Sequence, residues 1–206
     1  MRTYDVKRER RDLYAPGSGD VTIVEVPPMW FLMIDGRGDP NTSAAYREAV
    51  TGLYTLSYAV RAVIRSRLGR VHTVAPLEGL WSAADLDVFR TRDKDAWQWT
   101  LMIAQPDWVT ADLVGEARAA AQRKPLPALD RVSFACHSEG RSVQTLHIGS
   151  YDDEAPTLRR LHEQFLPAHG LVPTGRHHEI YLSDARRTEP ARLRTVLRQP
   201  VGPSGL

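Results

Sequence analysis

The sequence contains almost no cysteine and no long apolar run, and each absence excludes a class of protein. Only Cys136 is present among the 206 residues, so an intramolecular disulfide and a cysteine-rich metal cage are both excluded. No stretch of 18 apolar residues occurs, and the charged N-terminal residues 1–11 precede no hydrophobic segment. A membrane span and a secretory signal are therefore not expected, and we predict a cytoplasmic protein with no membrane partner.

An excess of charge of one sign is also missing. The chain has 27 basic and 25 acidic residues and a formal net charge of +2, which is too balanced for a protein that binds nucleic acid directly. It has no glycine-rich phosphate loop and no Gly-x-Ser-x-Gly elbow. Adjacent strand residues point in opposite directions, so His177 and His178 cannot readily share one metal ion. We expect neither a metal nor a cofactor.

What the sequence does contain is a repeated order of elements, which is clearest around one long helix. Between residues 46 and 68 apolar side chains recur at three- and four-residue spacing, which predicts a helix with one buried face. Ser43 is a suitable N-cap and Gly69 a suitable stop. The other elements predicted in the first half are strands at residues 21–26, 30–35, 70–81 and 97–105 and a helix at 110–123.

The second half repeats this order after a proline-rich linker at residues 124–128. Its predicted elements are strands at residues 132–137, 141–149, 176–183 and 194–199 and a helix at 156–168. We therefore predict an α+β fold in which two pseudo-symmetric strand-helix-strand-strand repeats, at about residues 19–124 and 128–200, form an antiparallel sheet. The helices are expected on one face, with a ligand cleft between the halves and a polar leader at residues 1–18.

Aromatic and titratable side chains gather on two of the predicted strands. Residues two apart on a strand share a face, so Trp97 and Trp99 project together. For the same reason His177, Glu179 and Tyr181 lie on one face, and the apolar positions between them predict that Glu179 is on the side without helices. Two alternatives remain open: the tryptophans could be core packing, and Glu179 could be an ordinary surface or ion-paired carboxylate.

Glu78 is a second candidate carboxylate. Regular alternation places Glu78 and Trp81 on opposite faces, and they share a face only if Gly79 permits a bulge. On the long helix Tyr54 and Tyr58 lie four residues apart and therefore on one side. Core packing is the simpler interpretation for Tyr58.

Five segments of the chain resemble the GyrI-like small-molecule-binding proteins. They occupy residues 76–81 (PLEGLW), 97–107 (WQWTLMIAQPD), 126–130 (LPALD), 146–152 (LHIGSYD) and 177–184 (HHEIYLSD). The resemblance implies a tandem duplication with a ligand cleft between the halves. In related multidrug-binding transcription activators a buried glutamate among aromatic residues receives bulky cationic drugs, and Glu179 matches that position.

The tryptophan-rich pattern is similar to one branch of this family, the cyclopropanoid cyclopropyl hydrolases. This resemblance implies a partner that is a flat polycyclic aromatic molecule, whose strained ring is opened by water, as in DNA-alkylating antibiotics of the yatakemycin and CC-1065 class. The candidates that it implies for an aromatic cage around the substrate are Tyr54, Trp81, Trp99, Phe134 and Tyr181. Trp97 is a further candidate for binding the substrate because it shares a strand face with Trp99. The candidates for catalysis are Glu179, Glu78, Tyr181 and His177. A drug-binding protein without catalysis and an inhibitor that binds DNA gyrase remain as alternatives.

Overall fold

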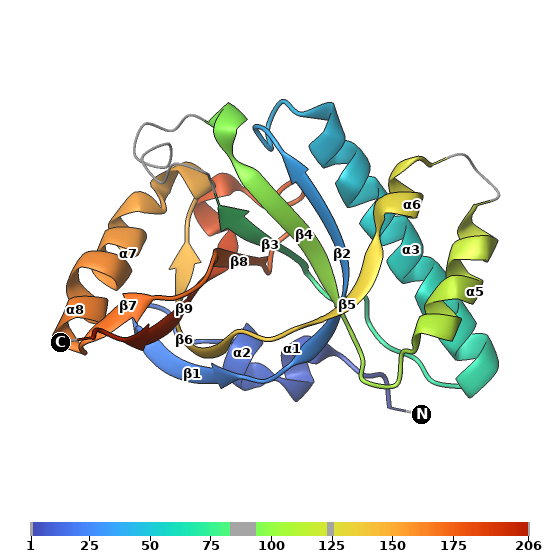
Figure 1. The fold of residues 1–206 in the computed structure, drawn as a ribbon, viewed down its shortest axis with the longest axis horizontal. Coiled ribbons are helices and arrows are strands. Elements are labelled where there is room, and N and C mark those ends of the chain that lie inside the picture. The colour runs from blue at the N-terminus through green and yellow to red at the C-terminus, as the bar shows by residue number, and fades with distance from the viewer. Residues whose placement is uncertain (1, 83–93, 123–125, 206) are drawn as a thin grey trace. The chain divides into compact units, whose positions relative to one another are not determined.

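The computed structural model of the protein describes residues 2–82, 94–122 and 126–205, and they form two compact units (Figure 1). The first unit comprises Met1–Glu9 and Met29–His137, and the second comprises Arg10–Pro28 and Ser138–Leu206. Residues 124 and 125 of the predicted linker lie outside the described residues, and a short helix, α6 (Ala128–Arg131), begins at its last residue.

The first unit is built on an antiparallel sheet whose strands follow the order β3-β4-β2-β5. Their bounds are β2 (Met29–Arg37), β3 (Leu77–Ser82), β4 (Gln98–Gln105) and β5 (Ser133–His137). The strand predicted at residues 70–81 is therefore shorter than expected. Within residues 70–75 the structure has only an isolated bridge from His72 to Tyr4, because this stretch meets the N-terminal segment instead of the sheet.

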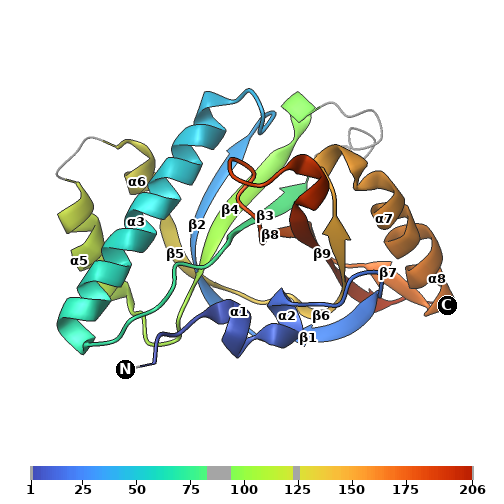
Figure 2. The same cartoon turned by 180° about the vertical axis from the view of Figure 1, so that it is seen from behind.

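Helix α3 (Ala44–Leu68) packs on β2 and β4 (Figure 2). The predicted caps are confirmed: the Ser43 hydroxyl accepts a hydrogen bond from the backbone N–H of Tyr46, and Gly69 adopts φ 62°, a left-handed conformation that favours glycine. The apolar stripe is buried, with Leu53, Leu56, Val60 and Ile64 fully inaccessible. The unit also contains α1 (Val6–Glu9), η1 (Lys94–Ala96) and α5 (Ala111–Ala121).

The second unit has an antiparallel sheet with the strand order β1-β6-β9-β8, and β7 pairs with the far end of β9. The strand bounds are β1 (Thr22–Val26), β6 (Gly140–Ile148), β7 (Leu171–Pro173), β8 (His177–Tyr181) and β9 (Arg194–Pro203). The sequence did not predict β7. The helical elements are α2 (Arg11–Tyr14), η2 (Tyr151–Asp153), α7 (Ala155–Arg159), the π-helical η3 (Arg160–Phe165), α8 (Leu166–Ala168) and η4 (Pro190–Arg192).

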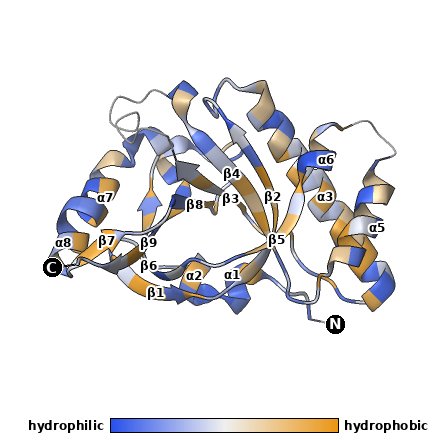
Figure 3. Cartoon of the chain, in the orientation of Figure 1, coloured by the Kyte–Doolittle hydropathy of each residue, from blue (hydrophilic) through white to orange (hydrophobic). Residues whose placement is uncertain are grey.

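One face of the second sheet is covered by the chain from α7 to α8. Val143 on β6 packs with Leu161 and Leu166 in a small apolar core. Helix α7 buries none of its residues, and hydrophilic and hydrophobic residues alternate along this part of the chain (Figure 3). The buried apolar contact therefore comes from η3 and α8.

The strand orders of the two units are the same. Reading from the strand that follows the helix, the first unit has β3-β4-β2-β5 and the second has β8-β9-β6-β1. The first strand of each repeat pairs with the second strand of the other repeat. β1 precedes β2 in the chain but pairs with β6, and β5 precedes β6 but pairs with β2. The α+β fold with antiparallel strands and several helices is thus confirmed.

The segment predicted as a polar leader carries structure of its own. It contains α1 and α2, and its residues Leu13 and Tyr14 are buried. The Arg198 guanidinium donates to the Leu13 carbonyl at 2.8 Å and to Glu139 at 2.9 Å. Leu13 and Tyr14 therefore belong to the core of the second unit, whereas α1 belongs to the first unit.

Candidate functional site

Glu179 lies at the centre of a titratable cluster on β8. The Tyr181 hydroxyl donates a 2.8 Å hydrogen bond to Glu179 Oε2, and His177 Nε2 lies 3.6 Å from Glu179 Oε1. The side chains of Glu179 and His177 are only 16% and 18% exposed. The shared face that the sequence predicted for these three residues is confirmed, and each carboxylate oxygen has a different neighbour.

The cluster lies on the helix-covered face of the sheet, so the predicted position of Glu179 on the side without helices is wrong. Glu179 pairs with Leu197 on β9, which pairs with Thr145 on β6, so the three side chains share a face. Arg160 of η3 donates to the Thr145 hydroxyl at 3.3 Å on this face. The opposite face holds Ile180 and the buried His178.

Two residues that the sequence analysis did not single out complete the cluster. Tyr151 meets Tyr181 edge to face at 5.6 Å between ring centroids. Burial, followed by the charges of Glu179, Glu154 and Asp184, raises the pKa of Tyr151 to about 12. Glu154, directly before α7, is 5% exposed. Burial first, then the nearby Glu179, raises its pKa well above the ordinary carboxyl value.

A second histidine lies next to the cluster. The rings of His162 and His177 are 6.3 Å apart. Burial, assisted by His177, lowers the pKa of His162 to about 4. Among the described residues neither ring nitrogen of His177 has a hydrogen-bond partner. His162 is therefore neutral at neutral pH, and His177 lies between the His162 ring and the carboxylate of Glu179.

The predicted aromatic candidates of the first unit form a cluster beside α3. The Trp81 ring is 5.6 Å from that of Trp97 and 6.4 Å from that of Tyr46, and the Trp99 ring is 5.2 Å from Tyr46. The register of β3 and β4 places Trp81 opposite Trp99. Three of the predicted binding residues therefore lie together, and Tyr46 was missed although it lies on the periodic stripe of the helix.

Trp99 has a clear packing role in this cluster. It is 1% exposed, its indole N–H donates to the Gly38 carbonyl at 3.3 Å, and its ring covers Gly36 on β2. A Cβ atom added at Gly36 would overlap this ring. The sequence left core packing open for the tryptophans, and the structure places Trp99 in the core.

We expect Gly36→Ala to destabilise the protein by about 1–3 kcal/mol, because the indole of Trp99 has to shift in a close-packed region. The matched control is Gly115→Ala on α5, where an added Cβ meets nothing within 4 Å and where alanine favours the helix by about 0.5–1 kcal/mol. Urea unfolding of both variants measures the effects. Equal stability of Gly36→Ala and the wild type would contradict this packing.

The remaining predicted residues lie apart from these clusters. Glu78 is fully buried, and regular pairing with β4 places it on the opposite face from Trp81, so no bulge occurs at Gly79. Phe134 stacks on Trp30 at 4.8 Å and pairs with Leu32, four residues along β2 from the Gly36 that faces Trp99. Tyr54 is half-buried on α3, two helical turns after the residue that contacts the tryptophans.

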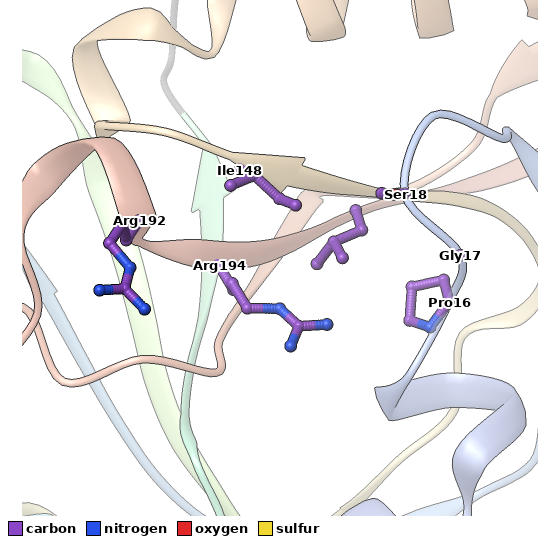
Figure 4. Close-up of a pocket in the computed structure, with 7 residues that line it drawn as sticks. Pro16, Gly17, Ser18, Ile148, Arg192 and Arg194 are labelled. Atoms are coloured by element: carbon purple, nitrogen blue, oxygen red, sulfur yellow. The ribbon is translucent and has the colours of Figure 1, made fainter.

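An open pocket of about 530 Å³ lies elsewhere in the second unit, and none of the predicted site residues lines it. Figure 4 shows Arg192 and Arg194 beside Ile148 and the turn from Pro16 to Ser18. Within the described part of the chain, no three His, Cys, Asp or Glu residues are grouped in a way that could hold a metal ion. The helices in the same residues are too short or too polar to span a membrane.

Comparisons with known proteins agree with this architecture. An uncharacterised conserved protein from Listeria innocua is 37% identical, with a TM-score of 0.89 over 97% of this chain and 100% of that one. A protein described as a hydrolase from Listeria innocua is 35% identical, with a TM-score of 0.83 over the same shares. The C-terminal domain of EcmrR, 12% identical with a TM-score of 0.57 over 89% of this chain and 98% of that one, shares the fold.

No protein of curated function matches the chain. A family model described as the GyrI-like small molecule binding domain matches residues 19–201. This range contains both units' sheets, the Glu179 cluster and the aromatic cluster around Trp81. The chain therefore belongs to the GyrI-like family of small-molecule-binding domains.

Proposed function

We propose that the protein is a hydrolase that binds a flat polycyclic cyclopropanoid and opens its cyclopropane ring by addition of water. One observation carries the proposal: Glu179 is a largely buried carboxylate held between a tyrosine hydroxyl and an imidazole. The family is one of small-molecule-binding domains, and two similar solved structures at 35% identity are described as hydrolases.

The internal repeat argues that Glu179 is not required by the framework. Trp81 pairs with Trp99 at the end of β3, and Tyr181 pairs with Thr195 at the end of β8. Two residues earlier, the first unit has Gly79 where the second has Glu179. A buried carboxylate is costly, so we propose that Glu179 serves the function of the protein and not its framework.

The proposed reaction needs a base for water. Glu179 takes a proton from the water molecule as the water oxygen bonds to the cyclopropane methylene carbon. The carbon–carbon bond of the ring breaks, and its electron pair converts the fused dienone into a phenolate, which is then protonated. A positioned general base contributes about 10²–10⁴-fold to such a step.

Tyr181 and His177 have different proposed roles. The Tyr181 hydroxyl already donates to Glu179 Oε2, so it fixes the carboxylate with Oε1 left for water. His177 has no hydrogen-bond partner among the described residues and can donate to the oxyanion that develops on the substrate. We assign the base to Glu179 and not to Glu78, because Glu179 has the tyrosine and imidazole contacts and Glu78 is fully buried.

Aromatic walls would bind the polycycle and shield it from DNA. We propose Trp81 and Trp97 as walls that contact the substrate, with Trp99 behind them as support because it is almost fully buried. Rings of this kind favour the partial positive charge on the attacked carbon by about 1–2 kcal/mol when desolvated. Tyr54 and Phe134 are proposed only as peripheral contacts.

The test is to mix a cyclopropanoid of the CC-1065 class with catalytic amounts of protein and follow the ring-opened product by mass spectrometry. In water labelled with heavy oxygen we expect one labelled oxygen in each product molecule and many turnovers per protein. Tight binding with unchanged drug would instead identify a sequestering protein. Neither turnover nor binding would overturn the proposed function.

A further inference from the structure

We propose that Glu154 is a second functional carboxyl of the Glu179 site and that the two residues together hold one proton at neutral pH. Glu154 is the protonated member of this pair. The pair itself is a property of the folded protein, whereas its use in catalysis rests on the function proposed above.

The surroundings of Glu154 are unusual for a glutamate. It occupies the N-cap position of α7, yet its side chain makes no capping hydrogen bond. The residue is 5% exposed, and within the described residues its Oε1 atom is buried without a hydrogen-bond partner. Glutamates are almost never this buried unless they are paired, so an ionised Glu154 would have no compensation at that oxygen.

Acidic groups dominate the neighbourhood. Glu179 lies on β8, Asp152 on η2 and Asp184 in the turn after β8. After burial, the charges of Glu179 and Asp152 raise the pKa of Glu154, and those of Glu179 and Asp184 raise the pKa of Tyr151. Burial is the first cause that raises the pKa of Glu154, and Glu179 and then Asp152 follow. Ionising both carboxyls in one low-dielectric site costs much more free energy than ionising one, so one of them keeps its proton.

Cations near the cluster are engaged elsewhere or are neutral. Arg160 on η3 donates to the Thr145 hydroxyl, and Arg186 pairs with Asp184 at the surface. His162 is neutral because burial and His177 lower its pKa to about 4. His177 itself faces Glu179 at 3.6 Å. The basic side chain that the structure places in contact with the pair is therefore His177, on the side of Glu179.

In the proposed hydrolysis the pair supplies both proton transfers. Glu179 accepts the proton of the attacking water, and Glu154 gives its proton to the phenolate oxygen, directly or through a second water molecule. Transfer of the acquired proton from Glu179 to Glu154 then restores the starting state. The net reaction is addition of one water molecule, with no other reactant.

Infrared difference spectroscopy of the full chain without ligand tests the pair. At neutral pH the wild type should show the C=O band of a protonated carboxylic acid, and Glu154→Gln should lose it. The exposed Glu163→Gln on η3 is the matched control and should keep the band. In Glu179→Gln the band should persist but titrate at lower pH, because one negative charge has been removed.

A folded wild type without this band at neutral pH would overturn the proposal, as would a band that survives in Glu154→Gln. Circular dichroism confirms that each variant is folded. Because no substrate is used, the result is separate from the proposed function: the band can be present in a protein that hydrolyses nothing. Where turnover occurs, Glu154→Gln should lower it about 10-fold or more and shift its pH profile.

Discussion

Replacing Glu179 with glutamine is expected to lower the rate of cyclopropane opening by about 10²–10⁴-fold while the protein remains folded. Glutamine has nearly the same shape as glutamate, and its side-chain oxygen can still accept the 2.8 Å hydrogen bond from Tyr181. It cannot take a proton from water. The loss should therefore appear in kcat, with drug binding retained.

Single-turnover kinetics with a cyclopropanoid, together with a direct binding measurement, separate these effects. Glu163→Gln serves as the control because it removes an exposed carboxylate from the same unit. Tyr181→Phe should show a smaller loss, since the phenol positions the carboxylate without taking the proton. Wild-type turnover by Glu179→Gln would exclude Glu179 as the base and leave its burial unexplained.

The periodic and capped parts of the chain could be predicted from the sequence because their determinants are local. The stripe that includes Leu53, Val60 and Ile64 follows the helical period, and Ser43 and Gly69 mark the ends of α3. Likewise, strand alternation correctly placed Glu179 beside Tyr181. Each of these inferences needed only residues close together in the sequence.

Which face of a strand is covered could not be read from the strand itself. Ile180 was expected under the helices. The strand face on which it lies instead carries the buried side chains of His178 and Arg198, which both contact Glu139, 39 residues before His178. Glu154 was missed for a similar reason. It follows two exposed aspartates in a polar stretch, and only the packing of η2 and α7 buries it.

The internal repeat separates framework from function more clearly than either half alone. Both units keep the strand order and an aromatic residue at the end of the strand after the helix, Trp81 in one and Tyr181 in the other. They differ at Gly79 and Glu179. The shared strand order accounts for the fold, and the proposed role of Glu179 rests on its burial and on its contacts with Tyr181 and His177.

A second large effect is expected where the structure buries charge for stability. The Glu139 carboxylate, 3% exposed, accepts hydrogen bonds from His178 Nδ1 at 3.0 Å and from Arg198 at 2.9 Å. Arg198 also donates to Gln144 and to the Leu13 carbonyl. Replacing Arg198 with methionine keeps much of the side-chain volume but removes three hydrogen bonds at once, those to Glu139, Gln144 and the Leu13 carbonyl. Of the two contacts of Glu139 described above, the one with His178 is left.

We therefore expect Arg198→Met to lower the free energy of unfolding by about 3–5 kcal/mol, the usual cost of breaking a buried ion pair by removing one partner. Urea unfolding at neutral pH measures it. The control is Arg192→Met, an exposed arginine whose replacement should change stability by no more than about 0.5 kcal/mol. Equal effects of the two substitutions would show that the buried network contributes nothing specific.

The same network predicts how stability depends on pH. Burial alone would raise the pKa of Glu139, but His178 and then Arg198 outweigh it and hold the pKa far below the ordinary value of 4.5. A carboxyl whose pKa is lower in the folded than in the unfolded chain stabilises the fold fully above the unfolded pKa, and that contribution is lost as the pH falls.

Removing Arg198 raises the pKa of Glu139 towards the unfolded value. The stability difference between wild type and Arg198→Met should therefore be largest at neutral pH and shrink in acid. A difference that stays constant with pH would mean that Arg198 stabilises the protein through packing and not through its charge.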